Sequence, residues 1–308
     1  MLARRGFKYS QMRKMKKLLL IVAVAIAAIF FAIPILYMWN CGPLCQGFSA
    51  YKAGRYARAL EVWMPLAEAG DDKAQQLIGL MYTESRGVAR DYNQAMKWFL
   101  KSAVQGNTAA QVGLGVMYEH GHGVPQDLNK AIEWYRKSAD RGDPTAETFL
   151  GIMYAKGQGA ARDDEQAVQW FQKAATQGSP RAYSLLGDMY LNGRGVQKDN
   201  QKAADSFRKA VALYSKAAEE GDAEAQTALG FAYVSGSGVP RDDKRAFEWF
   251  RKAAEQGVPI AQYNLSFMFG EGLGVAQDSK QAAEWYRRAC QAGCDFAPNQ
   301  PKRGIGAP

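Results

Sequence analysis

Histidine and cysteine are scarce in this chain. Its 308 residues include two histidines, His120 and His122, and four cysteines. A Ser-His-Asp triad would have to recruit the one segment that holds both histidines. Glu119, His120 and His122 are residue types that bind metals, but they fall at a loop position that varies along the chain. We therefore expect no metal, no cofactor, no small-molecule substrate and no enzymatic activity.

The four cysteines form two C-x3-C pairs, Cys41 with Cys45 and Cys290 with Cys294. A zinc site needs convergent ligands, and these pairs lie near opposite ends of the chain. Redox catalysis usually relies on a C-x-x-C motif. In an exported domain, so few cysteines indicate disulfides. Each pair is therefore a candidate local disulfide.

Acidic residues are absent from the first 17 positions, and this explains most of the net charge of +9. Residues 1–17 contain seven Lys or Arg side chains, whereas the rest of the chain is almost balanced. A nucleic-acid-binding protein needs a strongly basic face. Because the charge excess lies in this short segment, we expect no nucleic acid partner.

Charged side chains are also missing from residues 18–39. A helix of this length spans about 33 Å, which is enough for a bilayer core of about 30 Å. We predict a basic cytoplasmic segment over residues 1–17 and a single transmembrane signal anchor over residues 18–39, in the inner membrane. The positive charges before the span place the N-terminus in the cytoplasm. The rest of the chain would then lie in the periplasm of a Gram-negative bacterium.

Two alternatives to this anchor stay open. Ala25-Ile26-Ala27 is a candidate cleavage site, although cleavage there would leave a long apolar run at the new terminus. Cys41 is a candidate lipidation site, although Met38-Trp39-Asn40 before it is unlike the small residues of a lipoprotein signal.

The rest of the chain repeats one pattern, an alanine followed four residues later by Leu or Ile. The six pairs start at Ala74, Ala110, Ala146, Ala182, Ala225 and Ala261, in steps of 36, 36, 36, 43 and 36 residues. A fixed period in this range is typical of stacked helical hairpins. One hairpin cannot bury both its apolar stripes alone, so stacking into an all-α solenoid is predicted.

The second copy shows how each unit is built. Residues 110–118 have the apolar spacing of a helix, and residues 121–125 are rich in helix breakers. Asp127 then stands where an N-cap is needed. A second apolar stripe follows and ends at Gly142, a C-cap residue. The prediction is therefore helix–loop–helix in every copy.

The runs LGxMYxxGxGVxxD and AxxWFxKAAxxG make the chain resemble the Sel-1-like repeat, a relative of the tetratricopeptide repeat. The resemblance covers six repeats over about residues 72–294. It implies a right-handed superhelix whose first helices line the concave side, and protein–protein adaptor work in place of catalysis. Ser85, Ala160 and Ser266 depart from the pattern.

Three further segments stand out. Residues 40–71 resemble a degenerate tetratricopeptide hairpin that caps the array, with Pro65 expected to kink its second helix. Residues 295–308 hold no apolar stripe and are expected to be disordered. The 43-residue step lengthens one second helix by seven residues, about two turns. This extension is either a harmless insertion or a ridge that makes a docking point.

Positions along each first helix are numbered here from its leading alanine, which is position 0, and they indicate a candidate binding face. Positions 2, 6 and 9 lie away from the apolar stripe, on the side that related tetratricopeptide repeats use as a ligand groove. Solvent-facing helix positions are usually polar, yet position 6 is apolar in five of six copies. The predicted partner-binding groove consists of Leu80, Val116, Glu119, Ile152, Asp188, Leu191, Phe231, Val234, Tyr263 and Phe267. The alternative is that tight curvature lets these residues pack across the groove.

Three functions are compatible with these features. The preferred one is a membrane-anchored scaffold that binds a protein or peptide partner in its groove. The second is an immunity protein that neutralises a secreted toxin acting in the periplasm. The third, least favoured, is a cell-wall or penicillin-type hydrolase, because the S-x-x-K matches at Ser49 and Ser206 lack the K-T-G and S-D-N partners.

Overall fold

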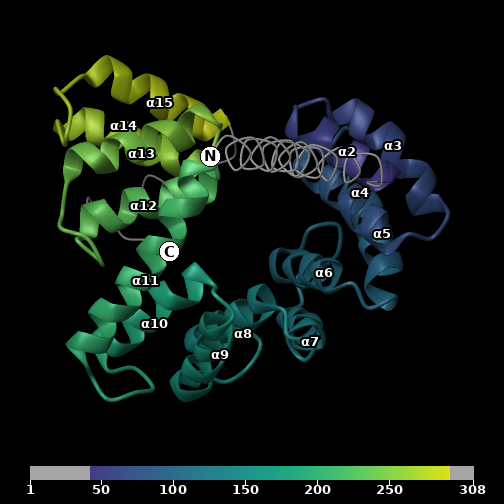
Figure 1. Ribbon diagram of the computed structural model, residues 1–308, viewed down its shortest axis with the longest axis horizontal. Helices are drawn as coiled ribbons and strands as arrows, with labels where there is room; N and C mark the ends of the chain where they lie inside the picture. Colours follow the sequence, from purple (N-terminus) through teal and green to yellow (C-terminus); the bar gives the residue numbers. More distant parts are fainter. Residues whose placement is uncertain (1–41, 292–308) are drawn as a thin grey trace, which may run out of the picture. The chain divides into compact units, whose positions relative to one another are not determined.

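The computed structural model describes residues 42–291, and its regular elements are fourteen α-helices with no strand in that part of the chain (Figure 1). This confirms the all-α repeat prediction. The chain divides into two compact units after Ala110. The right-handed superhelix stays a prediction. The predicted transmembrane span, residues 18–39, and the tail, residues 295–308, lie outside the described residues.

The first unit contains two helical hairpins. The helices are α2 (Pro43–Lys52), α3 (Tyr56–Glu68), α4 (Asp72–Glu84) and α5 (Tyr92–Val104), and each packs on the next. Trp63 of α3 is fully buried, and its indole Nε1 donates a 2.9 Å hydrogen bond to the Leu44 carbonyl. Helix α3 continues past Pro65 to Glu68.

The second unit holds the remaining repeats, each made of a first and a second helix. The helices are α6 (Thr108–His120), α7 (Leu128–Ala139), α8 (Pro144–Lys156), α9 (Asp164–Thr176), α10 (Pro180–Asn192), α11 (Asn200–Glu219), α12 (Ala223–Ser235), α13 (Asp243–Glu255), α14 (Pro259–Glu271) and α15 (Ser279–Gln291). From α7 onward, each helix packs against the next along the chain. Helix α11 is 20 residues long, so the seven added residues extend one continuous helix.

Within a hairpin, a glycine of the first helix lies against an aromatic ring of the second. A Cβ on Gly79 would be 2.7 Å from the Phe99 ring, and Gly151 and Phe171 are related in the same way. Phe171 is 1% exposed, so the glycine provides the space in which the ring is buried. Trp170 has a different role, because it packs against the apolar clusters of two consecutive hairpins.

The predicted N-caps are confirmed in every repeat. Each predicted aspartate accepts a hydrogen bond from a backbone N–H in the first turn of its second helix; the six are Asp91, Asp127, Asp163, Asp199, Asp242 and Asp278. The predicted C-cap needs correction. Helix α7 ends at Ala139 with Asp140 as its C-cap, and Gly142 lies two residues further on with φ 81°. Gly142 therefore shapes the turn that leads into the next repeat.

Glutamines connect consecutive repeats, a feature that the sequence analysis missed. The Gln75 amide donates to the Ala67 carbonyl at 3.0 Å and accepts from Gln105 at 2.8 Å. Gln226 makes the same pair of contacts, to Ala218 and from Gln256. These side chains satisfy backbone carbonyls at the end of a second helix, which would otherwise be buried without a partner.

Candidate protein-binding surface

The residues at position 6 of the first helices are half-buried where they are apolar. We call this set the first-helix column; its members are Leu80 in the first unit and Val116, Ile152, Asp188, Phe231 and Phe267 in the second. Each apolar member exposes part of its side chain, whereas Asp188 is exposed. The column therefore belongs neither to the core nor to a freely solvated surface.

The column also packs on the hairpins beneath it. Val116 and Ile152 contact neighbouring apolar clusters, and the Phe231 ring meets the buried Phe250 ring edge-to-face at 5.1 Å. No such ring contact is recorded for Phe267 among the described residues, although that side chain too is half-buried. Part of the surface of each apolar side chain is therefore buried by packing, as the alternative interpretation expects, and the rest of that surface is accessible to a partner.

Position 9 is less uniform than the sequence suggested. Val234 is 6% exposed and belongs to the core, so it does not contribute to the surface. The Glu119 carboxylate accepts a 2.6 Å hydrogen bond from the Tyr135 hydroxyl of the next helix. Leu191 is 42% exposed. Tyr263, at position 2 of α14, is half-buried.

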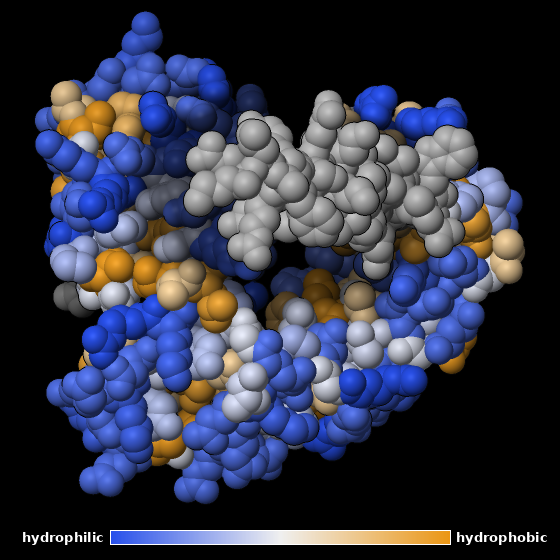
Figure 2. Space-filling view, viewed as in Figure 1, coloured by the Kyte–Doolittle hydropathy of each residue, from blue (hydrophilic) through white to orange (hydrophobic). Residues whose placement is uncertain are grey.

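Asp188 replaces the apolar residue of the column in α10. The surrounding protein raises its pKa above the ordinary value, and nearby Arg194 opposes that rise. Desolvation by neighbouring protein atoms disfavours the charged form of a carboxyl group, and this is the larger of the two effects at Asp188. On the face drawn in Figure 2, apolar side chains of the second unit gather in separate patches between polar ones.

A pocket of about 320 Å³ opens on the second unit, where the starts of α8, α10 and α12 meet the last turns of α11. It is lined by Thr145, Thr148, Phe149, Ser179, Pro180, Arg181, Tyr214, Ala217, Asp222, Glu224 and Ala225. Thr145, Arg181 and Glu224 are the residues just before the leading alanines. On a helix this position lies within about 60° of positions 2 and 6. The pocket therefore continues the face that carries the first-helix column.

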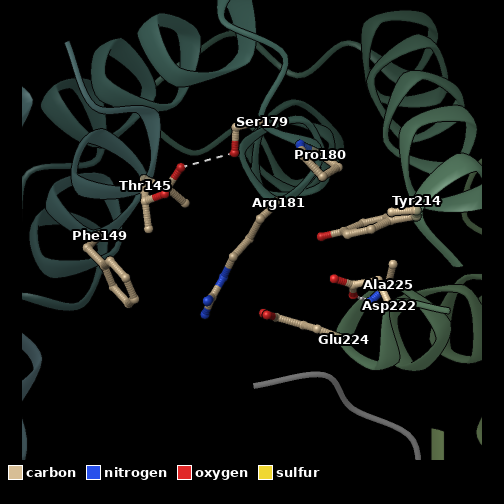
Figure 3. Close-up of a pocket in the computed structure, with 11 residues that line it drawn as sticks. Thr145, Phe149, Ser179, Pro180, Arg181, Tyr214, Asp222, Glu224 and Ala225 are labelled. Carbon is tan, nitrogen blue, oxygen red and sulfur yellow. Dashed lines mark hydrogen bonds between the residues drawn. The ribbon is translucent and has the colours of Figure 1, made fainter. Parts of the chain in front are cut away.

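One wall of the pocket is a stack of side chains. The Phe149 ring is stacked on the Tyr135 ring at 4.9 Å, and the Arg181 guanidinium lies over Phe149, 5.4 Å from the ring centre. In Figure 3 the Arg181 side chain points into the space between Phe149 on one side and Tyr214 and Glu224 on the other. Cation–π contacts of this kind favour one position of the guanidinium.

The opposite wall comes from the extension of α11. Tyr214 is half-buried there, and this burial raises the pKa of its hydroxyl to about 12. Asp222 caps α12 by accepting a 2.7 Å hydrogen bond from the Ala225 N–H. The Thr148 and Ser179 hydroxyls, both in the pocket lining, lie 3.3 Å apart. The extension could be predicted from the sequence but this pocket could not, because the lining residues are far apart in the chain.

The described residues do not test the predicted disulfides. Cys45 and Cys290 are described, but their predicted partners, Cys41 and Cys294, are not, so both disulfides stay predictions. Within residues 42–291 no three His, Cys, Asp or Glu side chains converge as metal ligands would. Among the described helices, none is long and apolar enough to cross a membrane.

Comparison with protein families identifies the repeats. Six consecutive segments match the sequence profile described as Sel1 repeat: residues 72–107, 108–143, 144–179, 180–222, 223–258 and 259–294. The fourth match is the longest, and it contains α11. No curated protein sequence matches the chain.

Several solved structures are similar to this chain. A Sel1 repeat protein from Oxalobacter formigenes is 38% identical, with 81% of this chain and 99% of that protein covered and a TM-score of 0.53. Escherichia coli c5321, described as a protective antigen of uropathogenic strains, is also 38% identical, with a TM-score of 0.44; the match covers 76% of this chain and 49% of that longer protein. Immunity protein Pa5087 from Pseudomonas aeruginosa is 22% identical, with 72% and 81% covered and a TM-score of 0.50, a likeness of fold alone.

Proposed function

Because the chain belongs to the Sel1 repeat family, we propose that it is a scaffold that binds a helix or an extended peptide of a partner protein on its first-helix face. Repeat scaffolds of this family are compatible with protein–protein interaction. The observation that carries the proposal is the first-helix column, in which apolar side chains stay partly accessible along successive helices. Accessible apolar strips between polar residues are typical of partner surfaces.

The chemistry of the candidate nucleophile supports a scaffold over a hydrolase. Ser206 is 9% exposed, and its hydroxyl donates a 2.7 Å hydrogen bond to the Lys202 carbonyl one turn earlier in α11. A hydroxyl bonded to the backbone of its own helix is not poised for nucleophilic attack. The immunity function has no observation of its own in its favour, since the likeness to Pa5087 concerns the fold.

We further propose that residues 18–39 tether the scaffold to the inner membrane with the repeats in the periplasm. The support is the uncharged stretch itself and the basic segment before it. A tether raises the effective concentration of the scaffold near membrane partners. Protease added to spheroplasts should digest the repeats while the inner membrane stays intact. Protection of the repeats until lysis would contradict this orientation.

The binding face is tested by substitution. Partners captured by crosslinking in cells are identified by mass spectrometry, purified, and titrated against the full chain. Phe267→Glu should weaken binding by at least about tenfold, because it places a charge in an apolar contact. The matched control is Leu100→Glu on the second helix α5, where Leu100 is 37% exposed. Circular dichroism checks the fold, and unchanged binding by Phe267→Glu would reject this face.

A further inference from the structure

We propose that the pocket between α8, α10, α11 and α12 selects an acidic side chain of the bound partner, with Arg181 as the residue that binds its carboxylate. The inference rests on the proposed protein-binding function and specifies its chemistry. The pocket lies on the same face as the first-helix column, so a peptide lying along that face reaches it.

Arg181 is held in place without an ion pair. Its guanidinium lies over the Phe149 ring, which is itself stacked on Tyr135. Among the described residues, Arg181 takes part in no ion pair, and the contact recorded for its side chain is the one with the Phe149 ring. A planar guanidinium presents two parallel N–H donors that match the two oxygens of a carboxylate. The side chain is therefore oriented and has donors left for a ligand.

The pocket lining holds one cation, Arg181, and two carboxylates, Asp222 and Glu224, and the carboxylates are stabilised at the start of α12. The Asp222 carboxylate is already bonded to the Ala225 N–H. Glu224 is in the first turn of α12, where the helix dipole stabilises a negative charge. Arg181 is the second residue of α10, where the same effect makes a positive charge less stable. A partner carboxylate would relieve that unfavourable placement.

The extension of α11 makes this pocket specific to one repeat. Tyr214 and Ala217, which form the wall opposite Phe149, lie in the last two turns of a 20-residue helix. The second helices of the other hairpins are shorter, with 12 or 13 residues each. Lys73 occupies the repeat position of Arg181 in α4, but no such wall stands beside it. The pocket thus places the Arg181 cation beside the wall formed by Tyr214 and Ala217. This combination suits a partner segment in which an acidic residue stands next to an apolar one.

A display library of random dodecapeptides tests this, with the full chain in mild detergent as bait. The selected peptides should share an acidic residue beside an apolar one. Arg181→Gln should weaken their binding by at least about tenfold, the usual effect of losing a hydrogen bond to a charged group. Lys73→Gln is the matched control and should leave the affinity unchanged. Glu224→Gln should keep or tighten binding, because it removes a like charge.

Each contrary outcome has a distinct meaning. Peptides that are basic, and whose binding is lost with Glu224→Gln, would overturn the assignment of Arg181. Peptides whose affinity falls with Phe267→Glu but not with Arg181→Gln would leave the protein-binding function standing and reject the pocket. A library that yields no binder at all would count against both. Fluorescence anisotropy of labelled peptides provides the affinities.

Discussion

A Cβ atom on Gly79 would lie 2.7 Å from the ring of Phe99, which is closer than real Cβ contacts come. Gly79 lies in α4 and Phe99 in α5, and both are buried. The first helix of this hairpin can approach the second only because position 5 has no side chain. The same arrangement recurs between Gly115 and Tyr135 in the next repeat.

Gly79→Ala should lower the free energy of unfolding by about 1–3 kcal/mol, the usual cost of overpacking a core. Gly270→Ala is the control within a helix, since the nearest atom to its added Cβ is 3.9 Å away. That change should raise stability by about 0.5–1 kcal/mol through helix propensity. Chemical denaturation of both variants gives the comparison. Equal effects of the two substitutions would reject the close-approach argument.

Ser85 is the one non-glycine residue with positive φ, 58°, among the described residues. It ends α4 in the left-handed conformation that glycine adopts at the equivalent Gly157 of α8. Ser85→Gly should therefore stabilise the chain by about 1 kcal/mol. Gly157→Ser should destabilise it by a similar amount. Thermal unfolding of the two variants should show shifts of opposite sign.

Glu147 stands where Gln75 and Gln226 stand in other repeats, and it is 1% exposed. Burial raises the pKa of its carboxyl above the ordinary 4.5, against the opposing effects of Lys173 and Gln177. Because the folded state binds this proton more tightly than the unfolded state does, stability falls as pH rises through the raised pKa. Ionised Glu147 is therefore a cost at neutral pH.

Glu147→Gln should raise the free energy of unfolding at pH 7 by about 1 kcal/mol. The gain should shrink as the pH falls below the pKa of the wild-type carboxyl, where both side chains are neutral. Denaturation curves from about pH 4, close to the ordinary pKa of a carboxyl, to about pH 8 measure this difference. If the gain in the free energy of unfolding did not change with pH, packing and not the charge of Glu147 would be its cause.

Deleting residues 208–214 from α11 should leave a folded chain. The deletion restores the 36-residue spacing and joins Phe207 to the sequence SKAAEEG. Phe207 still meets Gly187, as the aromatic residues of the other hairpins meet their glycines. The pocket loses Tyr214, so binding of acidic peptides should fall while far-ultraviolet circular dichroism keeps its helical signal. Loss of that signal would show that the extension is needed for folding.

Much of the fold could be predicted from the sequence because its signals are local. The aspartate caps and the apolar period act within a few residues, so a single copy reveals them, and six copies reinforce the pattern. The glutamine contacts were missed because Gln75 pairs with Gln105 at the other end of its own repeat, 30 positions away, and with Ala67 of the preceding hairpin. Only stacking brings them together.

The binding surface was predicted less well for the same reason. Helical spacing placed Val234 and Phe231 on related faces, but it cannot tell how far the next hairpin covers each of them. The structure buries Val234 and leaves Phe231 half accessible. Arg181 and Tyr214 lie 33 positions apart in sequence and belong to different helices of one repeat. No motif predicted that they share a pocket.

The length of α11 shows which insertions such an array can absorb. Seven residues complete two turns to within about 20° of helix rotation, so Phe207 and Tyr214 point almost the same way and the following repeat continues on the same side. An insertion of five residues would turn the downstream apolar stripe by about 140° and expose it to water. Growth of a second helix in this protein is therefore restricted to insertions that complete whole turns, such as about 7, 11 or 18 residues. A repeat lengthened in this way gains new surface without disturbing its neighbours.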